Sequence, residues 1–216
     1  MCGIAGIITS LDKKPDQATV KKMTDAIIHR GPDEAGIFID HGVGLGHRRL
    51  SIIDLKSGQQ PMTSTAGDVT IIYNGEIYNF VEIRAELEAK GYQFKTHSDT
   101  EVILNAYHAW GPDSVTRIRG MFAYVIHDNR TKQVFMARDR LGIKPLFYAP
   151  VGEKTYLFGS ELKALKAHPD FVGNIRKESL EDYFSLGDVA DPIPFTRMSI
   201  NWSRAIVWSL TLLPAK

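Results

Sequence analysis

The sequence is poor in cysteine, in net charge and in long apolar runs. Its single cysteine, Cys2, excludes an internal disulfide, and nothing in the composition requires an oxidising compartment. The formal net charge of +1 gives no broad electrostatic basis for binding nucleic acid or an acidic membrane. No run reaches the roughly 18 apolar residues of a membrane helix, and the start lacks the basic segment of a signal peptide. These absences predict a cytoplasmic protein without nucleic-acid or membrane partners.

The pattern of apolar residues predicts an α+β fold built in layers. Hydrophobic residues make up 44% of the chain, which is enough for a sizeable core. Short β-like runs are numerous, and the helices cluster instead of alternating with the strands. The expected strands are residues 3–9, 35–40, 43–47, 50–54, 69–73, 121–127, 133–138, 146–149 and 156–159. The expected helices are residues 20–27, 80–90, 103–110, 113–119, 161–167 and 178–186.

Cys2 lies one residue from the start, so its backbone nitrogen becomes a free amine if Met1 is removed. If Met1 is removed, Cys2 carries both a thiol and a free α-amino group, whose reference pKa values are about 8.5 and about 7.7–8.0. The amine is then a general base beside its own nucleophile. If Met1 stays, that nitrogen is an amide and cannot act as a base. The alternative interpretation is a small buried hydrophobe, since free cysteine is often buried.

The Asn74-Gly75 dipeptide allows two interpretations. Asn-Gly between apolar runs is a strong signal for a β-hairpin turn. The functional interpretation is that the Asn74 side-chain amide and the Gly75 backbone N–H hold the oxyanion of a tetrahedral intermediate. Taken alone, the dipeptide favours the hairpin.

Four charged segments have structural interpretations, and two of them, at Arg49 and Asp99, also have functional ones. Arg49 can clamp a carboxylate through two parallel hydrogen bonds, or it can be a solvated residue at a strand edge. Asp99 can bind an ammonium group, or its neighbourhood can cap the helix that follows. Residues 29–33, His-Arg-Gly-Pro-Asp, fit a loop held by side-chain hydrogen bonds, and residues 138–146 fit a charged turn after a strand.

The combination of these groups points to one reaction more strongly than any single group does. A nucleophile, an oxyanion hole, a carboxylate clamp and an ammonium binder are the parts needed to hydrolyse the side-chain amide of a free amino acid. The substrate is then glutamine, with Arg49 on its α-carboxylate and Asp99 on its α-amino group.

Six motifs in order resemble the class II glutamine amidotransferases, and in particular the glutaminase domain of glutamine-hydrolysing asparagine synthetases. The resemblance extends from residue 1 to about residue 192. Its motifs are Met1-Cys2-Gly3-Ile4-Ala5-Gly6, His29-Arg30-Gly31-Pro32-Asp33, Arg49-Leu50-Ser51-Ile52, Asn74-Gly75-Glu76-Ile77-Tyr78-Asn79, Ser98-Asp99-Thr100-Glu101, and Arg138-Asp139 through Lys144-Pro145-Leu146.

The resemblance implies a fold and a set of site residues. The fold is an N-terminal-nucleophile hydrolase, a four-layer αββα sandwich of antiparallel sheets. Cys2 is expected to form a γ-glutamyl thioester, with Asn74 and Gly75 as the oxyanion hole. The residues expected to bind glutamine are Arg49, Asn74, Glu76 and Asp99.

The resemblance also implies what lies outside this chain. The glutaminase domain is expected to need no metal or other cofactor. ATP and magnesium belong to the synthetase domain, which uses a Ser-Gly-Gly-x-Asp-Ser loop that does not occur here. The implied partners are glutamine and a separate synthetase domain or subunit, and homo-oligomerisation is left open.

Residues 193–216 depart from the family pattern, so the amidotransferase domain is assigned to residues 1–192. The tail has no Asp or Glu and holds two of the three tryptophans. One hypothesis is a frameshift near residue 192, because synonymous codons for the tail, read two bases later, give the family's sequence. A genuine short paralogue with its own tail is the alternative. Nucleotide sequence decides: an in-frame gene with no continuing synthetase reading frame contradicts the frameshift.

The sequence therefore predicts an enzyme that releases glutamate and ammonia from glutamine, the ammonia-supplying half of asparagine synthesis from aspartate. The competing interpretations are a truncated, non-catalytic binding or regulatory module, and a gene remnant that lacks the synthetase domain. A glutaminase assay on Met1-free protein separates the enzyme from the binding module, and Cys2→Ala should abolish the activity of the enzyme.

Overall fold

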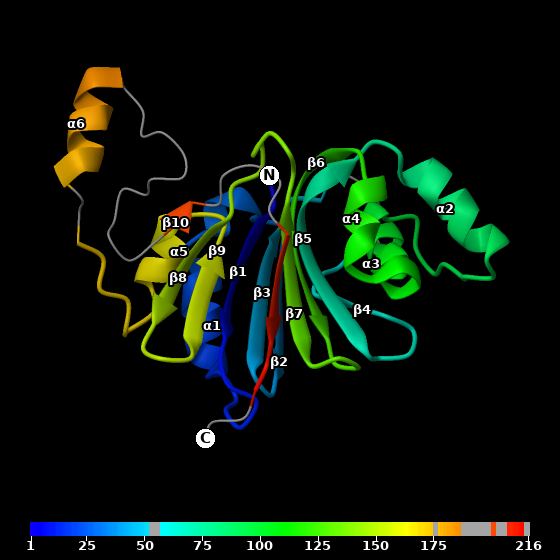
Figure 1. Ribbon diagram of the computed structural model, residues 1–216, viewed down its shortest axis with the longest axis horizontal. Helices are drawn as coiled ribbons and strands as arrows, with labels where there is room; N and C mark the ends of the chain where they lie inside the picture. Colours follow the sequence, from blue (N-terminus) through cyan, green and yellow to red (C-terminus); the bar gives the residue numbers. More distant parts are fainter. Residues whose placement is uncertain (52–56, 175–176, 187–199, 202–206, 214–216) are drawn as a thin grey trace.

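Two antiparallel sheets face each other, and helices cover their outer faces (Figure 1). The computed structural model describes residues 1–51, 57–174, 177–186, 200–201 and 207–213. The order of strands in the first sheet is β10-β8-β9-β1-β3-β2, and in the second sheet it is β11-β7-β6-β5-β4. Every strand pairing is antiparallel.

The elements have the following bounds. The strands of the first sheet are β1 (Gly3–Ile8), β2 (Glu34–Asp40), β3 (Val43–Arg49), β8 (Phe147–Val151), β9 (Thr155–Gly159) and β10 (Ile200–Asn201). Those of the second are β4 (Met62–Thr63), β5 (Val69–Ile77), β6 (Gly120–Asp128), β7 (Gln133–Arg138) and β11 (Val207–Thr211). The helices are α1 (Gln17–Asp25), η1 (Ile28–Arg30), α2 (Phe80–Ala89), α3 (Asp99–Trp110), η2 (Gly111–Asp113), α4 (Ser114–Arg117), α5 (Leu162–Lys166) and α6 (Lys177–Leu186).

Three apolar clusters separate four layers. Strand β1 shows the cause, since successive side chains of a strand point to opposite faces. Ile4 and Ile8 pack between the two sheets, whereas Ala5 and Ile7 pack against α1 and α5. The second sheet repeats the pattern, because its outer face packs against α2 and α3. The expected αββα sandwich is confirmed.

Most predicted elements occur within a few residues of their expected bounds. The helix expected at residues 113–119 is shorter, because η2 occupies its start and α4 ends at Arg117. The strand expected at residues 50–54 does not begin at Leu50, which has no regular structure, and residues 52–54 lie outside the described residues.

The tail contributes strands to both sheets. Strand β10 pairs with β8 and β11 pairs with β7, and Leu212 is buried between the sheets. Residues 193–199, 202–206 and 214–216 lie outside the described part of the chain. The domain boundary at residue 192 and the frameshift stay predictions. None of the described helices combines the length and apolar character that crossing a bilayer requires.

Candidate active site

The N-terminal residues lie at one end of the two sheets, where β1 begins (Figure 1). In the β1–β3 register Gly3 faces Arg48, which brings Cys2 to the end of β3. The Cys2 thiol is 3.6 Å from the Leu50 carbonyl oxygen, and the Leu50 N–H donates to Sγ at 3.4 Å. The thiol therefore lies against the Leu50 backbone at the end of β3.

The segment at residues 29–33 braces this end of β1, which supports the structural interpretation of that motif. Arg30 Nε donates to the Cys2 carbonyl oxygen at 2.9 Å, and Arg30 Nη1 is 3.0 Å from the Glu161 carboxylate. Gly31 packs directly on β3, because a Cβ there would lie 2.4 Å from Arg48 backbone atoms. Cys2 is therefore held by backbone contacts that leave its side chain available.

A cavity of about 200 Å³ opens beside Cys2. Every site residue expected from the sequence lines it, and both sheets and helix α3 contribute to its wall. The lining residues are Met1, Cys2, Arg49, Leu50, Gly58, Gln60, Tyr73, Asn74, Gly75, Glu76, Ser98, Asp99, Thr100, Met121 and Lys144. Residues separated by up to 143 positions thus meet at one small polar space.

Asn74 and Gly75 are not a hairpin turn, so that interpretation of the dipeptide is wrong. They lie inside β5, which continues to Ile77 and pairs with β6 as far as Gly120. Asn74 shares the face of Ile72, which packs between the sheets, and its side chain is buried. Its Nδ2 has no hydrogen-bond partner among the described residues. A buried amide donor without a partner points to a ligand acceptor at this position.

The Gly75 N–H is directed to the same cavity. Successive N–H groups of a strand point to opposite edges, so the N–H groups of every second residue share an edge. Those of Tyr73 and Ile77 point away from β6, because they donate to Gln60 Oε1 at 2.6 Å and to Asp99 Oδ2 at 3.1 Å. The Gly75 N–H lies between them on that edge, within the cavity wall.

Asp99 is a buried carboxylate at the start of α3. Ser98 caps the helix by accepting from the Thr100 N–H, which leaves the Asp99 side chain to face the cavity. Asp99 Oδ2 accepts from the Tyr73 hydroxyl at 2.8 Å and from Ile77 N. No basic side chain of the described residues forms an ion pair with it, and burial raises its pKa above the ordinary value.

Arg49 and Glu76 line other parts of the wall. Arg49 ends β3, is buried, and places Nη1 2.9 Å from Glu34 Oε2. Its guanidinium therefore enters the cavity already oriented by a carboxylate on one side. Glu76 is exposed on β5, at the rim of the cavity.

Three lining residues carry contacts that sequence reasoning missed. Tyr73 orients Asp99, and burial holds the Tyr73 pKa well above its usual range, so the hydroxyl stays a donor. Gln60 bridges β5 and α3, because its Nε2 donates to Thr100 Oγ1 at 3.3 Å. Lys144 lies in the last of the six motifs, but the sequence predicted no role for its side chain. A tyrosine next to Asn74 on β5 is the signal that pattern reasoning could have used.

An N-terminal cysteine at a cavity between two helix-covered antiparallel sheets is the arrangement of an N-terminal-nucleophile hydrolase. The same fold occurs in the glutamine phosphoribosylpyrophosphate amidotransferase of Bacillus subtilis complexed with ADP and GMP. The TM-score is 0.66 at 20% sequence identity, over 81% of this chain and 45% of that chain.

The glutamine amidotransferase domain family matches residues 1–201, so the chain belongs to that family. Asparagine synthetase [glutamine-hydrolyzing] 3 of Bacillus subtilis is 44% identical over 195 residues, which cover 89% of this chain and 32% of that protein. Putative asparagine synthetase [glutamine-hydrolyzing] 2 of Methanocaldococcus jannaschii is 40% identical over 213 residues, 89% of this chain and 40% of that protein. The chain spans about a third of the length of the curated relatives it matches. The family match supports a glutaminase function.

Proposed function

We propose that this chain hydrolyses the side-chain amide of glutamine through a thioester on Cys2. One observation carries the proposal: a single cavity holds the only thiol, an unpartnered buried amide donor, a guanidinium and a buried carboxylate without a basic partner. Within the described residues, these groups match the four polar parts of bound glutamine and its transition state.

The covalent step begins once Met1 is removed. The neutral α-amino group of Cys2 accepts the thiol proton, and Sγ attacks the amide carbon of glutamine. The carbonyl oxygen becomes an oxyanion that accepts hydrogen bonds from Asn74 Nδ2 and the Gly75 N–H. The C–N bond then breaks, the proton returns to the leaving nitrogen, and ammonia departs. Water hydrolyses the resulting thioester to glutamate with the same amine as its base.

Recognition of the amino-acid end uses the charged wall of the cavity. Arg49 pairs with the α-carboxylate, Asp99 with Glu76 holds the α-amino end, and Asn74 lies at the amide end of glutamine. Burying Asp99 without a cation costs stability, and a substrate ammonium supplies the missing partner. This pairing selects a free amino acid over an amide within a peptide.

The fate of the ammonia and the setting of the chain extend the proposal. The glutamine-hydrolysing names of the relatives support transfer of ammonia to a synthetase domain or subunit that makes asparagine from aspartate. ATP and magnesium are then required only by that domain, and residues 1–192 need no metal. A cytoplasmic location fits this role.

The test is a glutaminase assay on protein whose intact mass shows that Met1 is absent. We expect glutamate and ammonia to form in equal amounts. A folded, Met1-free protein that binds glutamine but releases no ammonia would refute catalysis and indicate a binding module.

An Asp99→Asn variant should bind glutamine poorly yet be more stable. Asparagine can still accept from the Tyr73 hydroxyl and Ile77 N, but it cannot pair with the substrate ammonium. Loss of one partner of a buried charge pair costs about 2 kcal/mol or more, so KM should rise about 30-fold or more. Steady-state kinetics measures this change, with the exposed Asp113→Asn as the control variant.

The stability effect has the opposite sign. The pKa of Asp99 is raised in the folded state, so protonated Asp99 adds to the stability of the fold. That contribution is complete below the unfolded pKa and is lost as pH rises through the folded pKa. At pH 7 without glutamine the wild-type protein carries that cost and Asp99→Asn does not. The melting temperature of the variant should therefore be higher at pH 7, and the difference should shrink towards pH 4. A lower melting temperature at pH 7 would contradict the electrostatic account of Asp99.

A further inference from the structure

The loop after β7 is built to fix the position of one residue, Lys144. The Asp139 carboxylate accepts hydrogen bonds from four backbone N–H groups. They are those of Phe122 at 3.1 Å, Leu141 at 3.1 Å, Ile143 at 2.9 Å and Lys144 at 2.9 Å. Arg138 Nε donates to the Lys144 carbonyl oxygen at 2.7 Å. The backbone on both sides of the Lys144 Cα is therefore held.

The Lys144 side chain turns into the cavity that contains Cys2. Lys144 is only 5% exposed and lines the cavity wall. Its Nζ lies 3.3 Å from the thioether sulfur of Met1, the residue bonded to Cys2. Among the described residues no carboxylate lies within ion-pair distance of Nζ. A thioether is a poor substitute for water or a carboxylate around an ammonium group.

The other cations near Cys2 are already compensated. Arg30 binds the Glu161 carboxylate as well as the Cys2 carbonyl, and Arg49 binds Glu34. Lys144 differs from them because its charge has no such partner in the described part of the chain. A buried unpaired charge destabilises a fold, so its presence beside a nucleophile indicates a role in the reaction.

The anionic groups around the cavity lie on other elements. Asp99 on α3 is bound by Tyr73 and Ile77, and Glu76 is exposed at the rim on β5. Bound glutamine is a zwitterion, and its two charges are assigned to Asp99 and Arg49. Removal of Met1 takes away the thioether beside Nζ and leaves the new α-amino group of Cys2 in the same cavity as the Lys144 ammonium.

We propose that Lys144 is a positioning residue whose ammonium keeps the Cys2 α-amino group uncharged and stabilises the Cys2 thiolate. The inference rests on the proposed glutaminase function and deepens it. Two ammonium groups in one small cavity repel, so the Lys144 charge favours the neutral amine, which is the form that takes the thiol proton. Lys144 itself gains and loses no proton. The proton moves from Sγ to the amine and then to the departing nitrogen.

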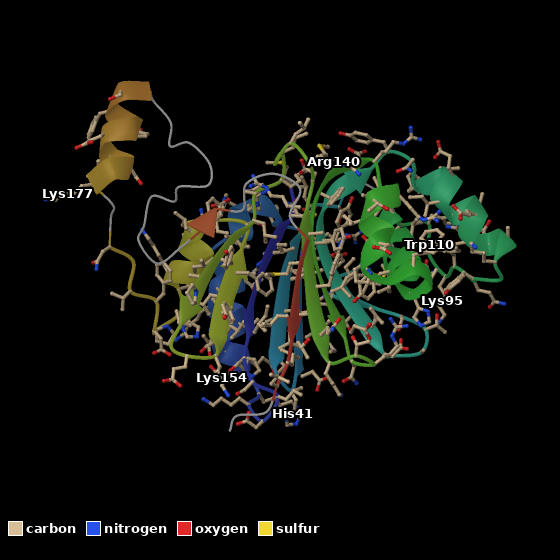
Figure 2. All side chains as sticks on the ribbon, in the orientation of Figure 1. His41, Lys95, Trp110, Arg140, Lys154 and Lys177 are labelled. Carbon is tan, nitrogen blue, oxygen red and sulfur yellow. The ribbon has the colours of Figure 1, made fainter. Side chains whose placement is uncertain are left out.

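The first test compares pH profiles of kcat/KM for Met1-free wild type, Lys144→Met and Lys144→Arg. Without the neighbouring cation the amine holds its proton to higher pH, so the acid limb of Lys144→Met should move up by about one pH unit. Activity should fall about 10-fold at pH 6.5 and much less at pH 9. Lys144→Arg, which keeps the charge, should retain the wild-type limb. Lys154→Met is the control. Arg140 belongs to the same loop as Lys144, and Lys154 lies at the opposite end of the sheets from Arg140 (Figure 2).

Thiol alkylation tests the inference without catalysis. Cys2 is the only cysteine, so the rate of its reaction with iodoacetamide reports its thiolate directly. The midpoint of that rate against pH should also move upward in Lys144→Met. If Lys144→Met fails to fold, Lys144→Gln gives the same comparison.

The outcomes are distinct. An unshifted acid limb and an unshifted alkylation midpoint overturn the role of Lys144, and a uniform rise in KM would assign it to the substrate carboxylate instead. A wild-type protein without glutaminase activity refutes the proposed function, and the alkylation midpoint still decides the effect of Lys144 on the thiol.

Discussion

A Cys2→Ala variant is expected to lose glutaminase activity by at least about 10⁴-fold, the scale seen when a covalent nucleophile is removed. No second thiol exists in the 216 residues to replace it. The oxyanion donors and the groups that bind glutamine remain in the variant, but no thioester can form. Release of ammonia from glutamine by mass-verified, Met1-free protein measures the effect.

The fold should not change with this substitution. The Cys2 side chain is half-buried and contacts backbone atoms of Leu50 only weakly, whereas Arg30 binds the Cys2 backbone, which the variant keeps. Glutamine should therefore still raise the melting temperature of Cys2→Ala. Turnover that survives in this variant would refute the thioester mechanism.

The same reasoning gives a control that leaves every side chain intact. An N-terminal extension turns the Cys2 nitrogen into an amide, which cannot accept the thiol proton. Protein with an uncleaved extension should be inactive, and proteolytic release of Cys2 should restore activity. This comparison separates the thiol from the amine as a cause of activity.

Strand positions were predictable because the strands bury side chains on both faces. Continuous apolar runs such as residues 3–9 and 121–127 predict such strands, and β1 and β6 occur at these positions. The end of β5 was not predictable from local residues. Asn-Gly favours a turn locally, but pairing with Gly120–Ala123 of β6 overrides that preference in the folded chain. The four layers came from the resemblance to the family and not from composition.

The candidate site divides in the same way. That Cys2, Arg49 and Asp99 lie together could be predicted, because their combination matches the parts of one substrate, and all three line the cavity. Their roles stay predictions. Gln60 and Lys144 could not be predicted, because their meaning depends on neighbours distant in sequence. The Gln60 side chain accepts a hydrogen bond from the Tyr73 N–H, and the Lys144 side chain contacts the side chain of Met1.

An Asn74→Ala variant is expected to lower kcat by about 10²–10³-fold with a smaller change in KM. The Asn74 amide is buried on β5, and its Nδ2 has no partner among the described residues until an oxyanion forms. A donor used mainly in the transition state contributes to kcat more than to substrate binding. Asn74→Asp, which has the same shape but presents an acceptor, should be at least as impaired. The exposed Asn129→Ala is the control.

Stability provides the second half of the test. A buried donor without a partner costs about 1–3 kcal/mol, and alanine removes that cost together with some packing. The melting temperature of Asn74→Ala should therefore not fall in step with its activity. A parallel loss of both would mean that Asn74 supports the fold. Loss of kcat in a protein that stays folded and keeps its affinity for glutamine places Asn74 on the oxyanion.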